Sequence, residues 1–134
     1  MLDPNSDSPL AVATNVFPCR VVLPAEWTDF FERRGPQLHY GEDSRRFIRT
    51  HFPAKALMEL GATHASIPRE FERHVVLMKD ISRGGVGFLH SAQLYPNERV
   101  ALVFPTGRRS YIVMRCLRHN DLCFEIGAEL AASG

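Results

Sequence analysis

The sequence predicts an all-β fold, a six-stranded antiparallel barrel, from three observations. From His51 onward, short apolar segments alternate with turns marked by Gly, Pro and Asn. In residues 99–104 the apolar side chains of Val100, Leu102 and Phe104 recur at every second position, as in a half-buried strand. Six strands this short hide their edges best by closing on one another, which favours a barrel.

Six segments fit the strands of this barrel: 55–60, 74–80, 86–90, 99–104, 110–117 and 122–130. Glycines mark a turn at 82–85, and Tyr-Pro-Asn-Glu marks another at 95–98. Thr106 and Gly107 predict a hairpin connection between the fourth and fifth segments. Gly127 is expected to interrupt the last strand.

The first 43 residues are predicted to form an N-terminal extension, and residues 44–134 the barrel domain. Residues 1–15 are poor in large apolar side chains and predict a flexible, disordered tail. Residues 16–23 could form a short strand, which Pro18 would restrict to an edge because proline has no backbone N–H to donate.

A short amphipathic helix is predicted over residues 25–34. Pro24 suits a first helical turn, and Gly35 followed by Pro36 ends the pattern. The aromatic residues within it, Trp27, Phe30 and Phe31, fall at helical spacing. We expect this aromatic stripe to pack on the barrel.

Charge and composition narrow the functional class. Sixteen basic residues against fifteen acidic ones give a formal charge of +1, which argues against binding a nucleic-acid polymer. The charge is unevenly distributed: residues 1–32 hold one Arg and five acidic side chains, whereas residues 33–49 hold five Arg and two acidic ones. The second segment therefore predicts attraction of a small anion.

Other classes find little support in the sequence. Three cysteines without a Cys-x-x-Cys pair argue against a disulfide framework, and the six histidines lack metal-binding spacing. No apolar run reaches the about 20 residues that span a bilayer, and the first residues do not resemble a secretory signal. No nucleophile motif is present. We expect a soluble cytoplasmic protein, without membrane insertion, cofactor or enzymatic activity.

Two local motifs carry the candidate chemistry. Arg45 and Arg49 form Arg-x-x-x-Arg just before the first barrel strand, and Asp80, Ser82 and Gly85 form Asp-x-Ser-x-x-Gly in a turn between two strands. In this order and spacing the two motifs resemble the signature of the PilZ domain. The resemblance covers about residues 44–130 and leaves the N-terminal extension outside it.

The resemblance implies a six-stranded PilZ-like β-barrel that binds cyclic di-GMP, often as an intercalated pair. The residue chemistry agrees with such a ligand, because a guanidinium forks onto the guanine edge or a phosphate with parallel hydrogen bonds. An Asp can accept from guanine donors, a Ser can donate to phosphate, and glycines permit positive φ and close approach. The predicted ligand residues are Arg45, Arg46, Arg49, Asp80, Ser82, Gly84 and Gly85.

The resulting hypothesis is an effector module. Binding of the dianionic dinucleotide would draw the basic segment over the barrel, change the surface around the N-terminal extension, and so signal to a partner protein. We expect a monomer or a weak homo-oligomer.

Two alternatives come from other classes. One is a PilZ-like protein-interaction module that binds no nucleotide and acts through its N-terminal extension. The other is a barrel that binds single-stranded nucleic acid. The strands hold few basic residues, which counts against this alternative. A purely structural interpretation also exists, in which the arginines pair with Glu42 and Asp43 and Asp80 caps its own turn.

Overall fold

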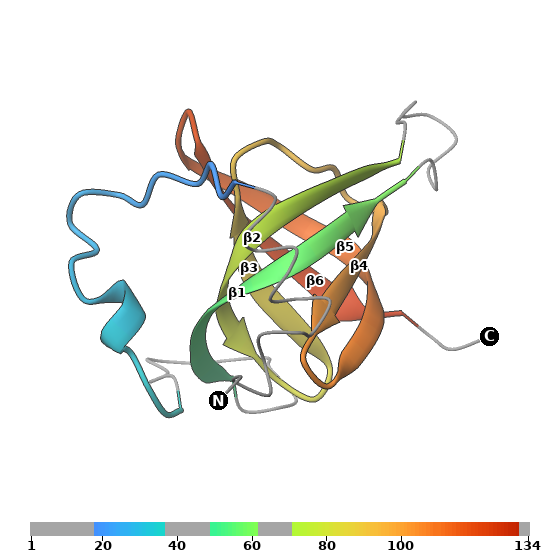
Figure 1. Cartoon of the computed structure of the whole chain (residues 1–134), viewed down its shortest axis with the longest axis horizontal. Helices are drawn as coiled ribbons and strands as arrows, with labels where there is room; N and C mark the ends of the chain where they lie inside the picture. Colours follow the sequence, from blue (N-terminus) through green and yellow to red (C-terminus); the bar gives the residue numbers. More distant parts are fainter. Residues whose placement is uncertain (1–17, 37–48, 62–70, 132–134) are drawn as a thin grey trace, which may run out of the picture.

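The computed structural model describes residues 18–36, 49–61 and 71–131, and its main feature is a closed barrel of six antiparallel strands (Figure 1). The order around the barrel is β1-β2-β3-β6-β5-β4, and β4 pairs back onto β1. The predicted six-stranded barrel is confirmed. Its strands are β1 (Thr50–Leu60), β2 (Glu72–Ile81), β3 (Gly85–His90), β4 (Arg99–Phe104), β5 (Gly107–Asn120) and β6 (Cys123–Leu130).

Several strand ends differ from the prediction, and at β1 a β-bulge accompanies the difference. β1 begins at Thr50 and runs through Pro53, because its register with β2 shifts between His51 and Ala54. A bulge can accommodate a residue that has no N–H to donate. The predicted interruption at Gly127 is wrong, since β6 passes through this residue without a break. It is β5 that bulges opposite Gly127, between Val113 and Arg115.

Alternate residues of the strands fill the barrel interior. Val100, Leu102 and Phe104 lie in one core cluster, so their predicted shared face is confirmed. Phe88 of β3 and Ile126 of β6 are fully buried in the same cluster. The cluster also contains Ala56, Met58, Leu60, Val76, Met78, Val86, Leu94, Tyr111, Val113 and Ala128. Inward side chains at 86 and 88, and at 126 and 128, leave the residues between them on the outer wall.

Residues 18–34, here called the strap, run along the outside of the barrel (Figure 1). The strap is tied to the β5–β6 turn, where the Val22 N–H donates to the Leu122 carbonyl at 3.0 Å. The Asn120 side-chain amide donates to the Val22 carbonyl at 2.9 Å. The part of the predicted edge strand that the structure describes, residues 18–23, is extended but forms no strand.

The predicted helix over residues 25–34 is wrong. A 3₁₀ turn, η1 (Phe30–Glu32), takes its place, and Asp29 at its start makes no capping hydrogen bond. The Asp29 carboxylate instead accepts from Arg33 at 3.1 Å. So short a segment cannot sustain a helix by propensity alone, and packing of its aromatic rings decides its conformation. Within the described residues, no helix has the length and apolar character required to cross a membrane.

The aromatic residues of the strap pack on the barrel as predicted, with one exception. Phe30 is buried in a second apolar cluster with Leu77 and Leu89 of the barrel wall. The Trp27 ring stacks on Phe30 with centroids 6.1 Å apart. Phe31 remains 51% exposed, because the 3₁₀ turn directs it away from this cluster.

Cys123 lies in this same cluster beneath the strap, and its thiol should be unreactive in the folded protein. Burial, together with the nearby Glu125 charge, raises the pKa of Cys123 to about 11. Because the thiolate is the reactive form, alkylation of Cys123 by iodoacetamide at pH 8 should be about 100-fold slower than in urea-unfolded protein. Mass spectrometry of the labelled peptide measures both rates. Rates within tenfold of each other would contradict the buried, protonated thiol.

Candidate functional site

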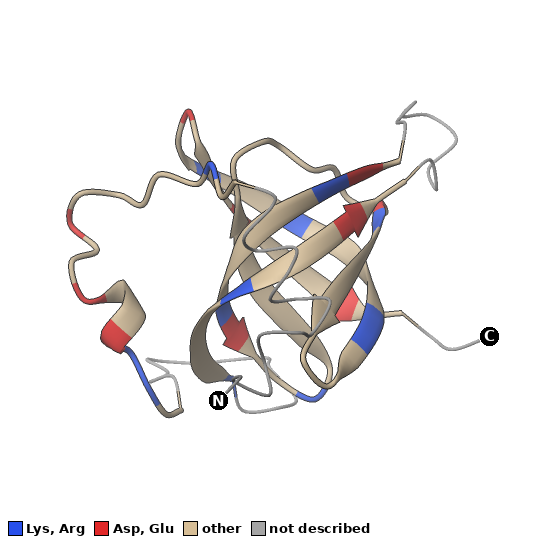
Figure 2. Cartoon of the chain, in the orientation of Figure 1, with Lys and Arg blue, Asp and Glu red and all other residues tan. Residues whose placement is uncertain are grey.

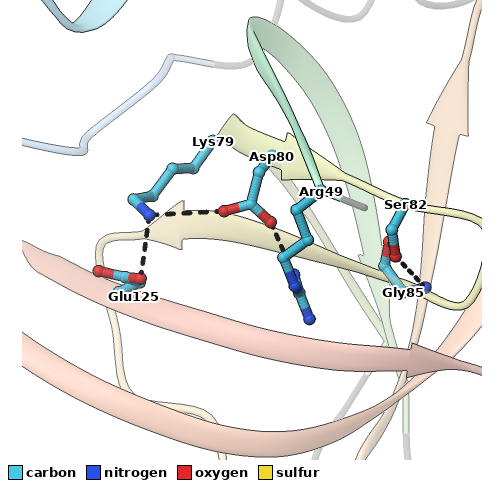
Figure 3. Close-up of polar contacts among 6 residues, drawn as sticks. All are labelled: Arg49, Lys79, Asp80, Ser82, Gly85 and Glu125. Carbon is cyan, nitrogen blue, oxygen red and sulfur yellow. Dashed lines mark hydrogen bonds and ion pairs between the residues drawn. The ribbon is translucent and has the colours of Figure 1, made fainter. Parts of the chain in front are cut away.

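The two sequence motifs meet at one corner of the barrel (Figure 3). Arg49 directly precedes β1, and Asp80 lies near the end of β2, paired with His51. The Arg49 Nη1 donates to the Asp80 Oδ1 at 2.7 Å, with the two side chains 18% and 5% exposed. The antiparallel pairing of β1 with β2 brings together residues that are 31 positions apart. Of the predicted arginine leader, Arg49 therefore lies against the Asp-Ser turn.

Lys79 is a second cation on the Asp80 carboxylate. Its Nζ lies 3.4 Å from the Asp80 Oδ2. The register of β2 against β3 shifts between Met78 and Asp80, so Lys79 is the extra residue of a β-bulge. A bulge of this kind allows two successive side chains to lie on one face of the sheet. Both cations compensate the buried Asp80 charge, which would otherwise be costly.

The Ser82 hydroxyl is used within its own turn. Its Oγ accepts from the Gly85 N–H at 3.2 Å and donates to the Gly85 carbonyl oxygen at 3.3 Å. The Ser82 N–H donates to that carbonyl at 2.9 Å. The Gly84 carbonyl accepts from the Leu130 N–H at 3.0 Å, which joins the turn to the end of β6. A ligand that used the Ser82 hydroxyl as a donor would compete with the bond to Gly85.

Gly85 serves close packing, and neither glycine of the turn uses a positive φ. Among the described glycines, positive φ occurs at Gly35 and Gly107, and neither Gly84 nor Gly85 adopts it. A Cβ at Gly85 would lie 2.5 Å from the Ala128 carbonyl oxygen. Gly85 therefore allows β3 to approach β6 closely. The positive φ that glycine permits is therefore not used at Gly84 or Gly85.

A row of four cross-strand partners passes through the site on the outer wall: Asp80 of β2, Gly87 of β3, Gly127 of β6 and Arg115 of β5. A Cβ at Gly87 would lie 2.8 Å from the Asp80 Oδ1, so the carboxylate rests over this glycine. A Cβ at Gly127 would lie 2.7 Å from the Arg115 Nε, so the arginine stem rests over that glycine. The two glycines let a carboxylate and a guanidinium lie across the sheet from opposite sides.

The polar network continues from Asp80 along the wall. The Lys79 Nζ also lies 3.4 Å from the Glu125 Oε2 of β6 (Figure 3). The other carboxylate oxygen of Glu125 lies 2.8 Å from the His119 Nε2 of β5. Blue and red bands adjoin at the end of β2 in Figure 2, where this network begins. From Arg49 to Glu125 cations and carboxylates alternate along it, so each of these charges has a neighbour of opposite sign.

The structure places five of the seven predicted ligand residues: Arg49, Asp80, Ser82, Gly84 and Gly85. Arg45 and Arg46 lie outside the described residues. Sequence reasoning missed Lys79, Gly87, Arg115 and Glu125. The residues from Gly87 onward lie outside both motifs and meet Asp80 only through strand pairing, so no local signal marks them. Lys79 adjoins Asp80 in sequence, but alternation along a regular strand would have put it on the opposite face.

Within the parts of the chain that the structure describes, no group of three or more His, Cys, Asp or Glu side chains could hold a metal ion. A scan of the chain against protein-family models finds no match, and a search of curated proteins finds no significantly similar sequence.

Proposed function

We propose that this chain is a PilZ-like module that binds cyclic di-GMP and passes the signal to a partner protein. The observation that carries the proposal is the ion pair of 2.7 Å between Arg49 and Asp80, which unites the two motifs at the Ser82–Gly85 turn. The closed six-stranded barrel is the fold that the PilZ resemblance implies.

Arg49 is the principal ligand contact in this proposal. A guanidinium already held by a carboxylate has lost much of its rotamer freedom, so binding a phosphate or a guanine edge costs less entropy. Arg115 supplies a further guanidinium on the same wall, across the Gly87–Gly127 pair. Arg45 and Arg46 are proposed as contacts on the sequence alone.

The role proposed for Asp80 is to position Arg49. Its carboxylate is buried and accepts from two cations, so direct acceptance from guanine would require it to give up one of them. A residue that fixes the orientation of an arginine contributes to specificity without touching the ligand.

Calorimetric titration with cyclic di-GMP tests the proposal. We expect saturable heat with a Kd of about 10 µM or tighter, which corresponds to about −7 kcal/mol. Arg49→Met should weaken binding at least about 30-fold, because a charge-assisted, bidentate contact is lost. Cyclic di-AMP has the same diphosphate ring but a different base edge and should bind at least about tenfold more weakly.

Arg73→Met is the matched control, because it also removes one cation of an ion pair on the barrel wall. Arg73 pairs with Glu59 at 3.1 Å, outside the network around Asp80. We expect this variant to bind like the unchanged protein. Absence of heat with either dinucleotide would refute the proposal and favour the interaction module that binds no nucleotide.

A further inference from the structure

Five charged or titratable side chains join the candidate site to the strap in an unbroken series. Arg49 contacts Asp80 at 2.7 Å, and Asp80 contacts Lys79 at 3.4 Å. Lys79 contacts Glu125 at 3.4 Å, and Glu125 contacts His119 at 2.8 Å. We call this series the ion-pair chain. Figure 3 shows its first four members: Arg49 ahead of β1, Asp80 and Lys79 on β2, and Glu125 on β6.

The far end of the ion-pair chain touches the strap. The His119 ring packs edge-on against Trp27 with centroids 4.8 Å apart. The next residue, Asn120, donates to the Val22 carbonyl of the strap at 2.9 Å. The Arg49 end of the ion-pair chain lies next to the residues that directly follow the strap. Pro36 forms a β-bridge with Thr50, the neighbour of Arg49, and the His51 N–H donates to the Gly35 carbonyl at 2.9 Å.

An anionic ligand that binds the other N–H groups of Arg49 shares its positive charge and so leaves the Asp80 carboxylate less fully compensated. Asp80 is 4% exposed, and a buried carboxylate without a counter-ion is strongly unfavourable. Lys79 can fill this role because it already contacts the second carboxylate oxygen of Asp80. Lys79 is shared with Glu125, however, so its movement toward Asp80 weakens the Lys79–Glu125 pair.

We propose that Lys79 is a positioning residue that takes a larger share in compensating the Asp80 charge when an anionic ligand shares the Arg49 guanidinium, and that this exchange of contacts changes the docking of the strap through Glu125 and His119. The inference rests on the proposed function for its ligand. The exchange moves no covalent bond and needs only a shift of one flexible lysine between two carboxylates. The strap is then the part of the molecule that reports occupancy to a partner.

The first test measures cyclic di-GMP binding by calorimetry in two variants. Lys79→Met should bind at least tenfold more weakly than the unchanged protein, and Lys79→Arg, which keeps the charge, should restore most of the affinity. Arg73→Met on the same strand is again the matched control and should stay within twofold. Binding by Lys79→Met at the unchanged affinity would overturn the inference while the proposed function stands.

A double variant separates the counter-ion role from simple attraction of the ligand by a positive charge. In an Asp80→Asn background no buried carboxylate needs compensation, so adding Lys79→Met should weaken binding by less than twofold. A further tenfold loss in that background would assign Lys79 to direct attraction of the ligand and overturn the counter-ion role.

The second test uses Trp27, the single tryptophan of the chain, as a reporter on the strap. Its fluorescence should change with cyclic di-GMP along the same saturation curve as the heat, and alkylation of Cys123 beneath the strap should accelerate at saturation. Both changes should be absent in Lys79→Met at saturating ligand. Heat without a change in Trp27 fluorescence would overturn the link to the strap.

A cycle in the ligand-free protein tests the connection along the ion-pair chain independently of cyclic di-GMP. Arg49→Met and His119→Gln are combined, and the unfolding equilibrium constant is measured for each variant. Each single variant changes the unfolding equilibrium constant by some factor. The factor for the double variant should differ at least threefold from the product of the two single factors, and this difference should vanish when Lys79→Met is added. If the Arg49→Met and His119→Gln factors simply multiply while Lys79 is present, the ion-pair chain does not connect Arg49 with His119.

Discussion

Gly85→Ala is expected to lower the free energy of unfolding by about 2–3 kcal/mol. The added Cβ would lie 2.5 Å from the Ala128 carbonyl oxygen, which is main chain and cannot rotate away. β3 cannot retreat from β6 either, because β2 pairs with its other edge. Chemical denaturation followed by circular dichroism measures the loss.

Gly61→Ala provides the matched control for this prediction. A Cβ at Gly61 would meet the Phe71 ring at 3.9 Å, an ordinary contact distance. The free energy of unfolding should therefore change by less than about 0.5 kcal/mol. Equal effects at Gly85 and Gly61 would show that the close approach of β3 to β6 is not what requires glycine.

Gly87→Ala, two residues further along β3, should affect ligand binding more than stability. The new methyl would lie 2.8 Å and 3.0 Å from the two carboxylate oxygens of Asp80, so the carboxylate must turn away. Its pair with Arg49 would lose its geometry. We expect affinity for cyclic di-GMP to fall about 30-fold, with a loss of about 1–2 kcal/mol in the free energy of unfolding. Calorimetry and denaturation measure the two effects separately.

The control for Gly87→Ala is the same change in an Asp80→Ala background. Without the carboxylate, the methyl at residue 87 has room, and no further loss of affinity or stability is expected. An additional large loss in that background would mean that Gly87 acts on the backbone of β3 and not through Asp80.

Much of the barrel was predictable because its strands carry local signals. The alternation at Val100, Leu102 and Phe104 and the turn residues after Tyr95 located β4, whose observed ends coincide with the prediction. The extra residues of β1 and the continuity of β6 at Gly127 were not predictable, because bulges depend on the facing strand. The helical spacing of the aromatic residues did not predict the conformation of the strap, because their packing on the barrel overrides the local helix propensity.

The candidate site was predictable only in part. The convergence of Arg49 on Asp80 followed from the paired motifs, since each flanks a strand of the same hairpin. The roles of Lys79, Glu125 and His119 depend on a bulge and on strand pairing. Their spacing in the sequence gives no sign that these three side chains meet. Asp80 itself was expected to face a ligand, whereas the structure surrounds it with two cations of the chain.

The barrel closes through a short seam, in which β1 pairs with β4 only from Leu57 to Leu60. The opposite side is joined more extensively, because every residue of β3 from Gly85 to His90 pairs with β6. Local opening begins where the fewest main-chain bonds must break, so this seam should unzip before the wall of β3 and β6. The barrel can therefore open locally between β1 and β4 while Gly87, Gly127 and the Asp80 carboxylate keep their geometry.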